Sequence, residues 1–155
     1  MIYFDSAYVA KFYLNEPGHE LVRACAISAG DVATCELALA EVTAVFHRKL
    51  REGFLTLAEA EIFFAEFDRD VQQGLWNLLP LKSELLEQVA GAYRTLPTTV
   101  FLGSADALHL ICARENGFAE IHTNDRHLLT AAPHFGLIGV DVTSGCGPFT
   151  ASSSS

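Results

Sequence analysis

Three aspartates stand where the ligand-binding edge of a predicted sheet would lie. Asp5 directly follows an apolar, β-prone run at residues 2–4, and Asp125 follows a second such run at residues 119–123. Asp106 lies in the first turn of a predicted helix, so it belongs to a helix N-terminus on the same edge. In open parallel sheets, ligands bind beyond the carboxyl ends of the strands. We therefore expect these three carboxylates to face one site.

A fourth carboxylate, Glu41, is expected to approach from another direction. It lies two turns into the helix predicted after the strand at residues 32–34, on the flank of that helix's apolar stripe. A half-buried glutamate costs free energy unless something pairs with it. Taken alone, the other acids also fit simpler roles: a helix cap for Asp5, a dipole complement for Asp106, and a turn or cap for Asp125. All four acids on one edge favour a shared site.

The chemistry of converging carboxylates follows from their mutual repulsion. Several of them a few ångströms apart cannot all ionise cheaply without a counter-charge. All-oxygen ligand sets suit hard cations such as Mg²⁺ or Mn²⁺, which also bind phosphate oxygens. Such an ion lowers the pKa of bound water and neutralises charge that builds up on a phosphoryl group. The acids therefore predict phosphodiester hydrolysis.

Alternating strand and helix signals predict the frame that positions these acids. The predicted strands lie at residues 2–4, 32–34, 75–79, 119–123 and 137–142, and helices lie between them at 7–14, 19–26, 34–52, 56–73, 83–96, 104–116 and 126–131. Thr34 and Ser104 are the expected caps of their helices. This alternation predicts an α/β fold with a mostly parallel sheet of four or five strands flanked by helices. We expect one domain over residues 1–142 and a flexible tail over 143–155, which ends in four serines.

Composition narrows the class of protein. The chain has 155 residues, 50% of them hydrophobic, which excludes intrinsic disorder. Four scattered cysteines (Cys25, Cys35, Cys112 and Cys146) have no metal-binding spacing and indicate a reducing cytosol. We expect neither a membrane span nor a secretion leader. The formal net charge of −9 counts against a nucleic-acid binder, but a carboxylate site becomes neutral or positive once cations occupy it.

Other motifs carry less chemistry. The six histidines lack zinc-site spacing, and His109 is interpreted as a packing or site-rim residue on the helix face of Asp106. Ala7 stands where an aspartate-nucleophile phosphatase needs its second aspartate, and no phosphate-binding glycine loop or nucleophile elbow occurs. The basic cluster at residues 47–51 fits a solvated helix end. It also fits a phosphate contact, because Arg48 lies on the same helix face as Glu41.

Four segments together give a resemblance to a known family. They are Ile2-Tyr3-Phe4-Asp5-Ser6, the run Thr34–Val42 (TCELALAEV), the run Ser104–Leu110 (SADALHL), and the run Ile121–Leu129 (IHTNDRHLL). In this order the chain resembles the PIN-domain ribonucleases of the VapC-like toxin type, from residue 1 to about residue 142.

The resemblance assigns roles to particular residues. It implies that Asp5, Glu41, Asp106 and Asp125 form an acidic metal site for Mg²⁺ or Mn²⁺. Supporting roles fall to Ser6 and to Thr123, whose hydroxyl would steady the site. Apart from the resemblance, Arg48 and Lys49 of the basic cluster are the candidate RNA contacts. One departure is Cys35, where relatives often carry serine. A thiol is a poorer hydrogen-bonding group than a hydroxyl, so we expect this position to support the site less well.

The resemblance also implies an activity and partners. The activity is a metal-dependent endoribonuclease that leaves a 5′-phosphate, with a cognate antitoxin in the cytoplasm. An arginine from that antitoxin would bridge Asp5 and Asp106 in place of the metal. The helix face around Phe12, Tyr13 and Leu14 is expected to take the rest of the antitoxin or a second copy in a homodimer.

Two alternatives remain open at this stage. One is a binding module that keeps the acidic pocket but does not cut, and the other is a DNA-directed nuclease of the same fold.

Overall fold

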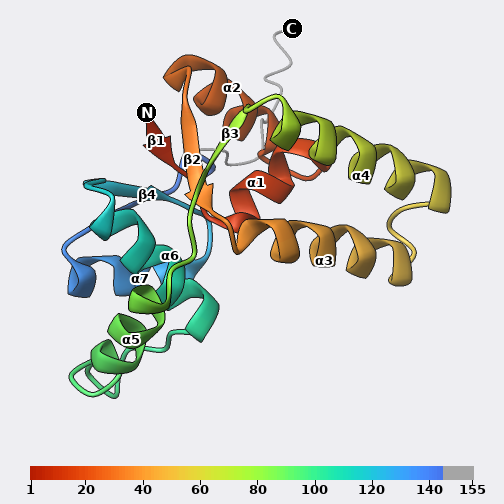
Figure 1. Cartoon of the computed structure of the whole chain (residues 1–155). Coiled ribbons are helices and arrows are strands. Elements are labelled where there is room, and N and C mark those ends of the chain that lie inside the picture. Colours follow the sequence, from red (N-terminus) through yellow and green to blue (C-terminus); the bar gives the residue numbers. More distant parts are fainter. Residues whose placement is uncertain (145–155) are drawn as a thin grey trace, which may run out of the picture.

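Five short parallel strands form the centre of the computed structural model, which describes residues 1–144 (Figure 1). One sheet contains β1 (Ile2–Tyr3), β2 (Val32–Cys35) and β3 (Trp76–Leu79), in that order, and a second sheet pairs β4 (Glu120–His122) with β5 (Ile138–Val140). A parallel bridge between Phe4 and His122 joins the two sheets. The predicted α/β architecture is therefore confirmed, with the parallel strands divided between two sheets.

The bridge gives the five strands the spatial order β3-β2-β1-β4-β5. The chain moves outward in one direction from β1 to β3 and in the other direction from β4 to β5, so the order reverses between β1 and β4. In open α/β sheets such a reversal opens a crevice at the carboxyl ends of the strands, where ligands bind. Asp5 lies directly beyond β1, and Thr123 lies directly beyond β4.

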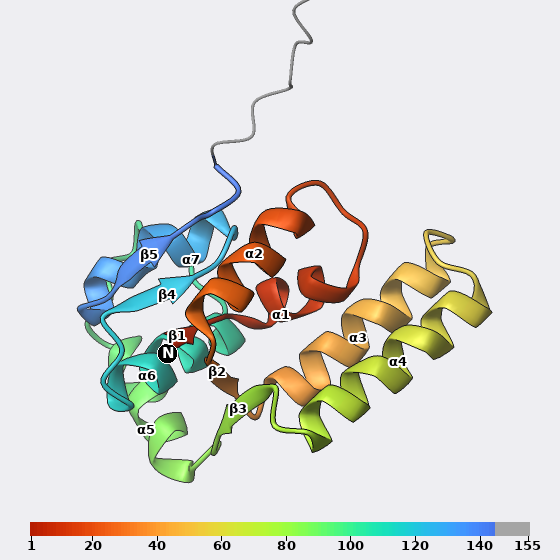
Figure 2. The same cartoon turned by 90° about the horizontal axis from the view of Figure 1, so that it is seen from above.

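Helices cover both faces of the strands (Figure 2). One face carries α1 (Ser6–Tyr13), α2 (His19–Ala29), α3 (Ala38–Arg51) and α4 (Leu57–Gln72); the other carries α5 (Ser83–Ala92), α6 (Ser104–Glu115), α7 (Arg126–Ala131) and the 3₁₀ turn η1 (Ala132–Phe135). None of the helices within residues 1–144 is long and apolar enough to cross a membrane.

Successive side chains of each strand point to opposite faces of the sheet and so belong to two separate hydrophobic cores. Tyr3 packs with the residues of α5, α6 and α7, whereas the next residue, Phe4, packs with α1 to α4. In the same way Val32 faces the α1–α4 side and Ala33 the opposite side. Successive side chains of a strand point to opposite faces, so both faces of each strand must be apolar. Cys35 is buried in the same core cluster as Tyr3 and Ala33.

The helix face expected to bind a partner is instead part of the core. Tyr13 and Leu14 are each only 3% exposed. The Tyr13 ring packs edge-on against Phe46, and its hydroxyl accepts a hydrogen bond from Nε1 of Trp76 at 2.7 Å. This expectation was wrong because the apolar residues at the end of α1 are covered by α3, α4 and β3.

Two predicted helix caps also differ in the structure. Thr34 lies within β2, fully buried, and α3 begins only at Ala38, so Glu41 lies in the first turn of α3 rather than two turns into it. Gly103, not Ser104, is the N-cap of α6, and it makes no side-chain cap. At the start of α4, Thr56 and Glu59 form a capping box.

Two predicted elements are shorter than expected, and the predicted tail is described only in part. The helix predicted to run to residue 96 ends at Ala92, and the last strand covers Ile138–Val140 only. Of the predicted tail, Thr143 and Ser144 hydrogen-bond to Asp141, and residues 145–155, with Cys146, lie outside the described part of the chain.

Candidate active site

Asp5 is held rigidly at the start of α1. Its backbone is extended, so one carboxylate oxygen caps the helix by accepting a hydrogen bond from the Tyr8 amide at 2.8 Å. The other oxygen accepts a hydrogen bond from the Thr123 hydroxyl at 2.5 Å. The Asp5 amide donates to the carbonyl of His122, which ties the ends of β1 and β4 together. Asp5 is 5% exposed, so its carboxylate is fixed and largely dry.

Thr123 connects Asp5 to Asp125. Its hydroxyl donates to Asp5 and accepts from the Asp125 amide at 2.9 Å. One oxygen of Asp125 accepts from the amides of His127 and Leu128 and caps α7. The cap role considered for Asp125 is therefore real, and it leaves the second carboxylate oxygen without a hydrogen bond among the described residues.

Glu41 belongs to a buried network centred on His109. The Ser6 hydroxyl donates to Oε2 of Glu41 at 2.6 Å, and Nε2 of His109 lies 2.9 Å from that oxygen and 2.9 Å from the Ser6 hydroxyl. A carboxylate only accepts hydrogen bonds, so Nε2 carries a proton and donates it to Glu41, while Nδ1 lies 2.8 Å from the Tyr3 hydroxyl, within hydrogen-bonding distance. The network therefore links α1, α3, α6 and β1.

His109 is the site residue that the sequence reasoning missed. It is 1% exposed and sits at the centre of this network, not at the rim. Its spacing from Asp106 was the available signal, since residues three apart share a helix face and α6 presents both to the strand ends. What the sequence does not show is that Tyr3, Ser6 and Glu41 surround it.

Asp106 is electrostatically coupled to all three of the other acids. Burial raises its pKa, and the charges of Asp125 and Glu41 raise it further, against the opposing charge of His109. Burial is also the main reason why the pKa of Asp5 rises to about 6, with a smaller contribution from Asp106. Hydrogen bonds from Thr123 and Tyr8 oppose that rise.

Glu41 and His109 each shift the other's pKa toward its charged form, whereas the pKa values of Asp5 and Asp106 shift away from their charged forms. Burial disfavours the charged form of Glu41, but the hydrogen bonds from His109 and Ser6 outweigh it and lower the pKa of Glu41. Burial likewise lowers the pKa of His109, and the hydrogen bond and charge of Glu41 outweigh this and raise it. Glu41 is therefore held ionised beside two aspartates that resist ionisation.

The donor set fits a hard divalent cation. Within residues 1–144, no three side chains of the types His, Cys, Asp and Glu lie close enough together to hold a metal ion as placed. Asp106 is nevertheless coupled to Asp5, Glu41 and Asp125, and burial raises the pKa of both Asp5 and Asp106, which a bound cation would offset. Gly103 leaves room there, because a Cβ at that position would lie 3.1 Å from Oδ2 of Asp106.

We expect the affinity for Mn²⁺ to fall below about pH 6, because protons compete for Asp5. The folding stability of the metal-free protein depends on pH in the opposite way. Burial raises the pKa of Asp5 from 3.8 to about 6 in the folded state, so the stabilisation from Asp5 is present below 3.8 and is lost as the pH rises through about 6. Thermal unfolding should show a larger stabilisation by Mn²⁺ at about pH 7.5 than at about pH 5. An increment that does not change between those pH values contradicts this assignment.

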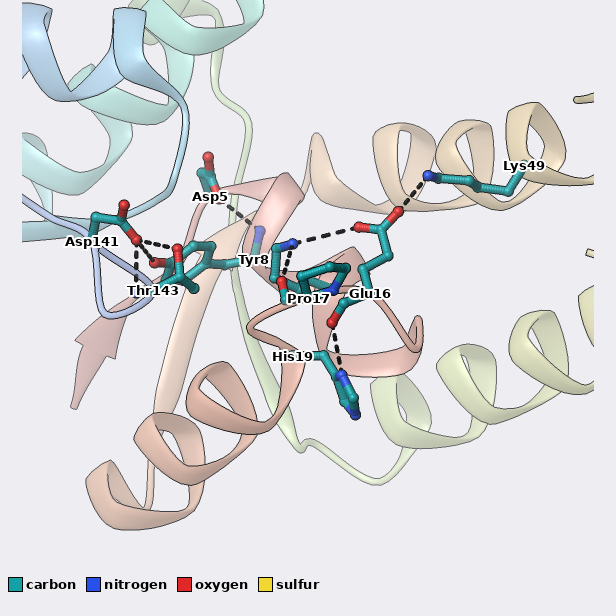
Figure 3. Close-up of polar contacts among 9 residues, drawn as sticks. Asp5, Tyr8, Glu16, Pro17, His19, Lys49, Asp141 and Thr143 are labelled. Atoms are coloured by element: carbon teal, nitrogen blue, oxygen red, sulfur yellow. Dashed lines mark hydrogen bonds and ion pairs between the residues drawn. The ribbon is translucent and has the colours of Figure 1, made fainter. Parts of the chain in front are cut away.

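Arg48 and Lys49, the predicted RNA contacts, lie farther along α3. Arg48 is exposed, whereas Lys49 forms an ion pair with Glu16 from the loop after α1 (Figure 3). Both line a groove of about 250 Å³ between α1 and α3. The groove begins at Ala7 and Asn124, next to the acidic crevice.

The fold and the acidic crevice at the strand reversal define an α/β protein of the PIN class. The sequence matches the family model of the PIN domain over residues 2–132, so the chain belongs to the PIN domain family. No curated protein matches the chain.

Solved structures share this fold at low sequence identity. The VapC20 toxin of Mycobacterium tuberculosis, described as cleaving the sarcin-ricin loop, has a TM-score of 0.64 and 15% identity over 84% of this chain and 95% of its own. FitAcB from Neisseria gonorrhoeae has a TM-score of 0.66 and 17% identity over 92% and 98%. FitAB bound to an IR36 DNA fragment has a TM-score of 0.68 and 16% identity over 92% and 96%.

Proposed function

We propose that this PIN domain is a Mg²⁺- or Mn²⁺-dependent endoribonuclease and the toxin of a toxin–antitoxin pair. The observation that carries the proposal is that Asp106 is electrostatically coupled to Asp5, Glu41 and Asp125, which come from three other segments of the chain. PIN domains are generally nucleases, and their members typically use divalent metals. The donor set described above suits such an ion.

Each acidic residue of the crevice has its own role in the proposed reaction. Asp5 and Asp106 hold the cation, which supplies an activated water and neutralises charge on the phosphoryl group when bound. Glu41 is ionised and fixed by His109 and Ser6, so it accepts a hydrogen bond from the attacking water and orients it. Asp125 completes the acidic shell. In-line attack of that water on phosphorus breaks the bond to the 3′ oxygen, which takes up a proton and leaves as a 3′-hydroxyl, so that the phosphate stays on the 5′ oxygen.

An exposed aromatic side chain supports a single-stranded RNA substrate. Phe101 is 73% exposed and its ring lies 4.7 Å from that of His127. Phe101 lies just before α6, whose first turn carries Asp106, and His127 lies two residues after Asp125. Aromatic side chains of this kind stack on unpaired bases, which is how proteins commonly read loops and single strands of RNA. The likeness to VapC20, described as cleaving the sarcin-ricin loop, agrees with this choice.

The likeness to FitAB supports an antitoxin partner, and we propose that the pair acts in the cytoplasm with a homodimer of this chain as the toxin unit. The crevice suits an antitoxin arginine, because a guanidinium bridging Asp5 and Asp106 satisfies both carboxylates without a metal. With Tyr13 and Leu14 buried, the exposed apolar residues of the α3–α4 hairpin, Phe54 and Leu57, are the better anchors for that partner.

The test is cleavage of matched RNA and DNA oligonucleotides by the purified chain. We expect RNA to be cut in Mg²⁺ or Mn²⁺ and left intact in EDTA, because the reaction needs a cation to neutralise the charge that builds up on the phosphoryl group. Cleavage of the DNA arm alone would favour the DNA-directed nuclease. This alternative is tested because FitAB, which has a similar fold, was solved bound to DNA. No cleavage of either arm, with metal bound, would favour a module that has lost the reaction.

A further inference from the structure

The groove between α1 and α3 begins beside the segments that carry Ser6 and Asp125. It is lined at one end by Ala7 and Asn124, which directly follow Ser6 and precede Asp125 in the sequence. Its wall on α3 includes Val45, one turn beyond Glu41. A polymer whose scissile bond lies in the crevice therefore has this groove as an adjoining path.

The groove is basic although the whole chain is acidic. Its charged lining residues are Lys11, Glu16, Arg48 and Lys49, three cations against one anion. The complete chain has only 10 Lys and Arg against 19 Asp and Glu, so a local excess of cations is against the general trend. Exposed cations along a groove are the usual means of binding a phosphodiester backbone.

Glu16 sits between the two lysines. Its Oε1 pairs with Nζ of Lys49, and its Oε2 lies 3.5 Å from Nζ of Lys11, which also donates to the carbonyl of Pro17 at 3.3 Å. Figure 3 shows the Glu16 carboxylate directed at Lys49 across the space between the loop and α3. Lys11 is 8% exposed, which is unusual for a lysine and fixes its ammonium in place.

The Glu16 carboxylate is held in the way that a bound phosphate group would be. Two anionic oxygens held by two ammonium groups reproduce the way a phosphodiester group, with its two non-bridging oxygens, is held by lysines. Glu16 belongs to the loop between α1 and α2, not to a helix or strand, so it can withdraw without disturbing either core.

We propose that Lys11 and Lys49, with Arg48 beside them, form a subsite for a backbone phosphate of the nucleic acid, and that Glu16 occupies this subsite in the free protein. The inference rests on the proposed nuclease function and adds a regulation to it. An incoming phosphate must displace Glu16, so weakly held strands are rejected and strands that engage the crevice as well are admitted. Glu16 is thus an internal competitor of the substrate.

The test is equilibrium binding of a fluorescent oligonucleotide, as RNA and as DNA of the same sequence, measured by anisotropy in EDTA at several salt concentrations. All proteins carry Asp106→Asn, so that no strand is cut. We expect Glu16→Gln to tighten binding about fivefold and to steepen the salt dependence by about 0.7 in slope, the value of one added contact to a single strand. Lys49→Gln should weaken binding by a similar factor.

The matched control is Glu20→Gln, which makes the same change in net charge at an exposed position on α2. Equal tightening by Glu16→Gln and Glu20→Gln would overturn the proposal, because only net charge would then matter. Weaker binding by Glu16→Gln, with an unchanged circular dichroism spectrum, would overturn it as well.

The outcome is separable from that of the nuclease test. Tightening by Glu16→Gln in either arm supports the phosphate subsite even if the chain with its native Asp106 cuts nothing, and an effect confined to the RNA arm assigns the strand. Cleavage of RNA without any effect of Glu16→Gln on binding would leave the nuclease function standing and remove the subsite.

Discussion

Asp106→Asn should reduce the rate of RNA cleavage by at least about 100-fold, while the protein remains folded. The substitution keeps the shape of the side chain but removes one charge that holds the cation. Loss of one such electrostatic contact to the reaction commonly costs about 3–4 kcal/mol, and each 1.36 kcal/mol is about tenfold in rate. Burial and the charges of Asp125 and Glu41 already disfavour the ionised form of Asp106, so the neutral amide is tolerated by the metal-free fold.

The measurement is single-turnover cleavage of an RNA oligonucleotide, with thermal unfolding recorded for the same samples. Asp68→Asn is the matched control, because Asp68 is an exposed acid on α4, away from the crevice. The account expects wild-type cleavage from the control. Undiminished cleavage by Asp106→Asn would show that Asp106 is not part of the reaction site.

His109→Ala should lower the free energy of unfolding by about 3 kcal/mol, the cost of a buried cavity together with unpaired polar groups. The imidazole is 1% exposed and contacts Tyr3, Ser6 and Glu41. Its removal leaves the buried Tyr3 hydroxyl without its partner and frees Glu41 from the hydrogen bond that fixes it. The same variant should also shift the pH profile of cleavage upward, because the pKa of Glu41 rises when that hydrogen bond is lost.

Urea unfolding of His109→Ala is compared with that of His47→Ala, a change at an exposed position on α3. A loss of stability no greater than that of the control would contradict the network. His109→Gln is a second test of the network, since a glutamine amide can still donate a hydrogen bond to Glu41. It should recover part of the stability and move the pH profile back toward that of the native chain.

The fold could be predicted because its signals are local. Strands and helices alternate, Asp5 and Asp125 cap the helices that follow their strands, and the capping box at Thr56 marks the start of α4. The same signals place the acids, since a residue that ends a parallel strand lies at the ligand-binding edge.

What could not be predicted depends on contacts between distant segments. The start of α3 was placed too early because Thr34 has the chemistry of a cap, but pairing with β3 keeps that residue in the sheet. The burial of Tyr13 is decided by Trp76 and Phe46, which lie 63 and 33 residues away in the sequence. The role of His109 likewise depends on Tyr3 and Glu41, and no spacing along one helix reveals that these residues meet.

The central claim is that four carboxylates from separate segments hold one divalent cation. Anomalous diffraction from crystals soaked in Mn²⁺ tests it most directly. The account predicts a peak in the crevice between β1 and β4, with oxygens of Asp5 and Asp106 at about 2.1 Å, the distance typical of small divalent cations, and its loss in crystals of Asp5→Asn. The absence of a peak there at saturating Mn²⁺, in a protein that still cuts RNA, would contradict the account.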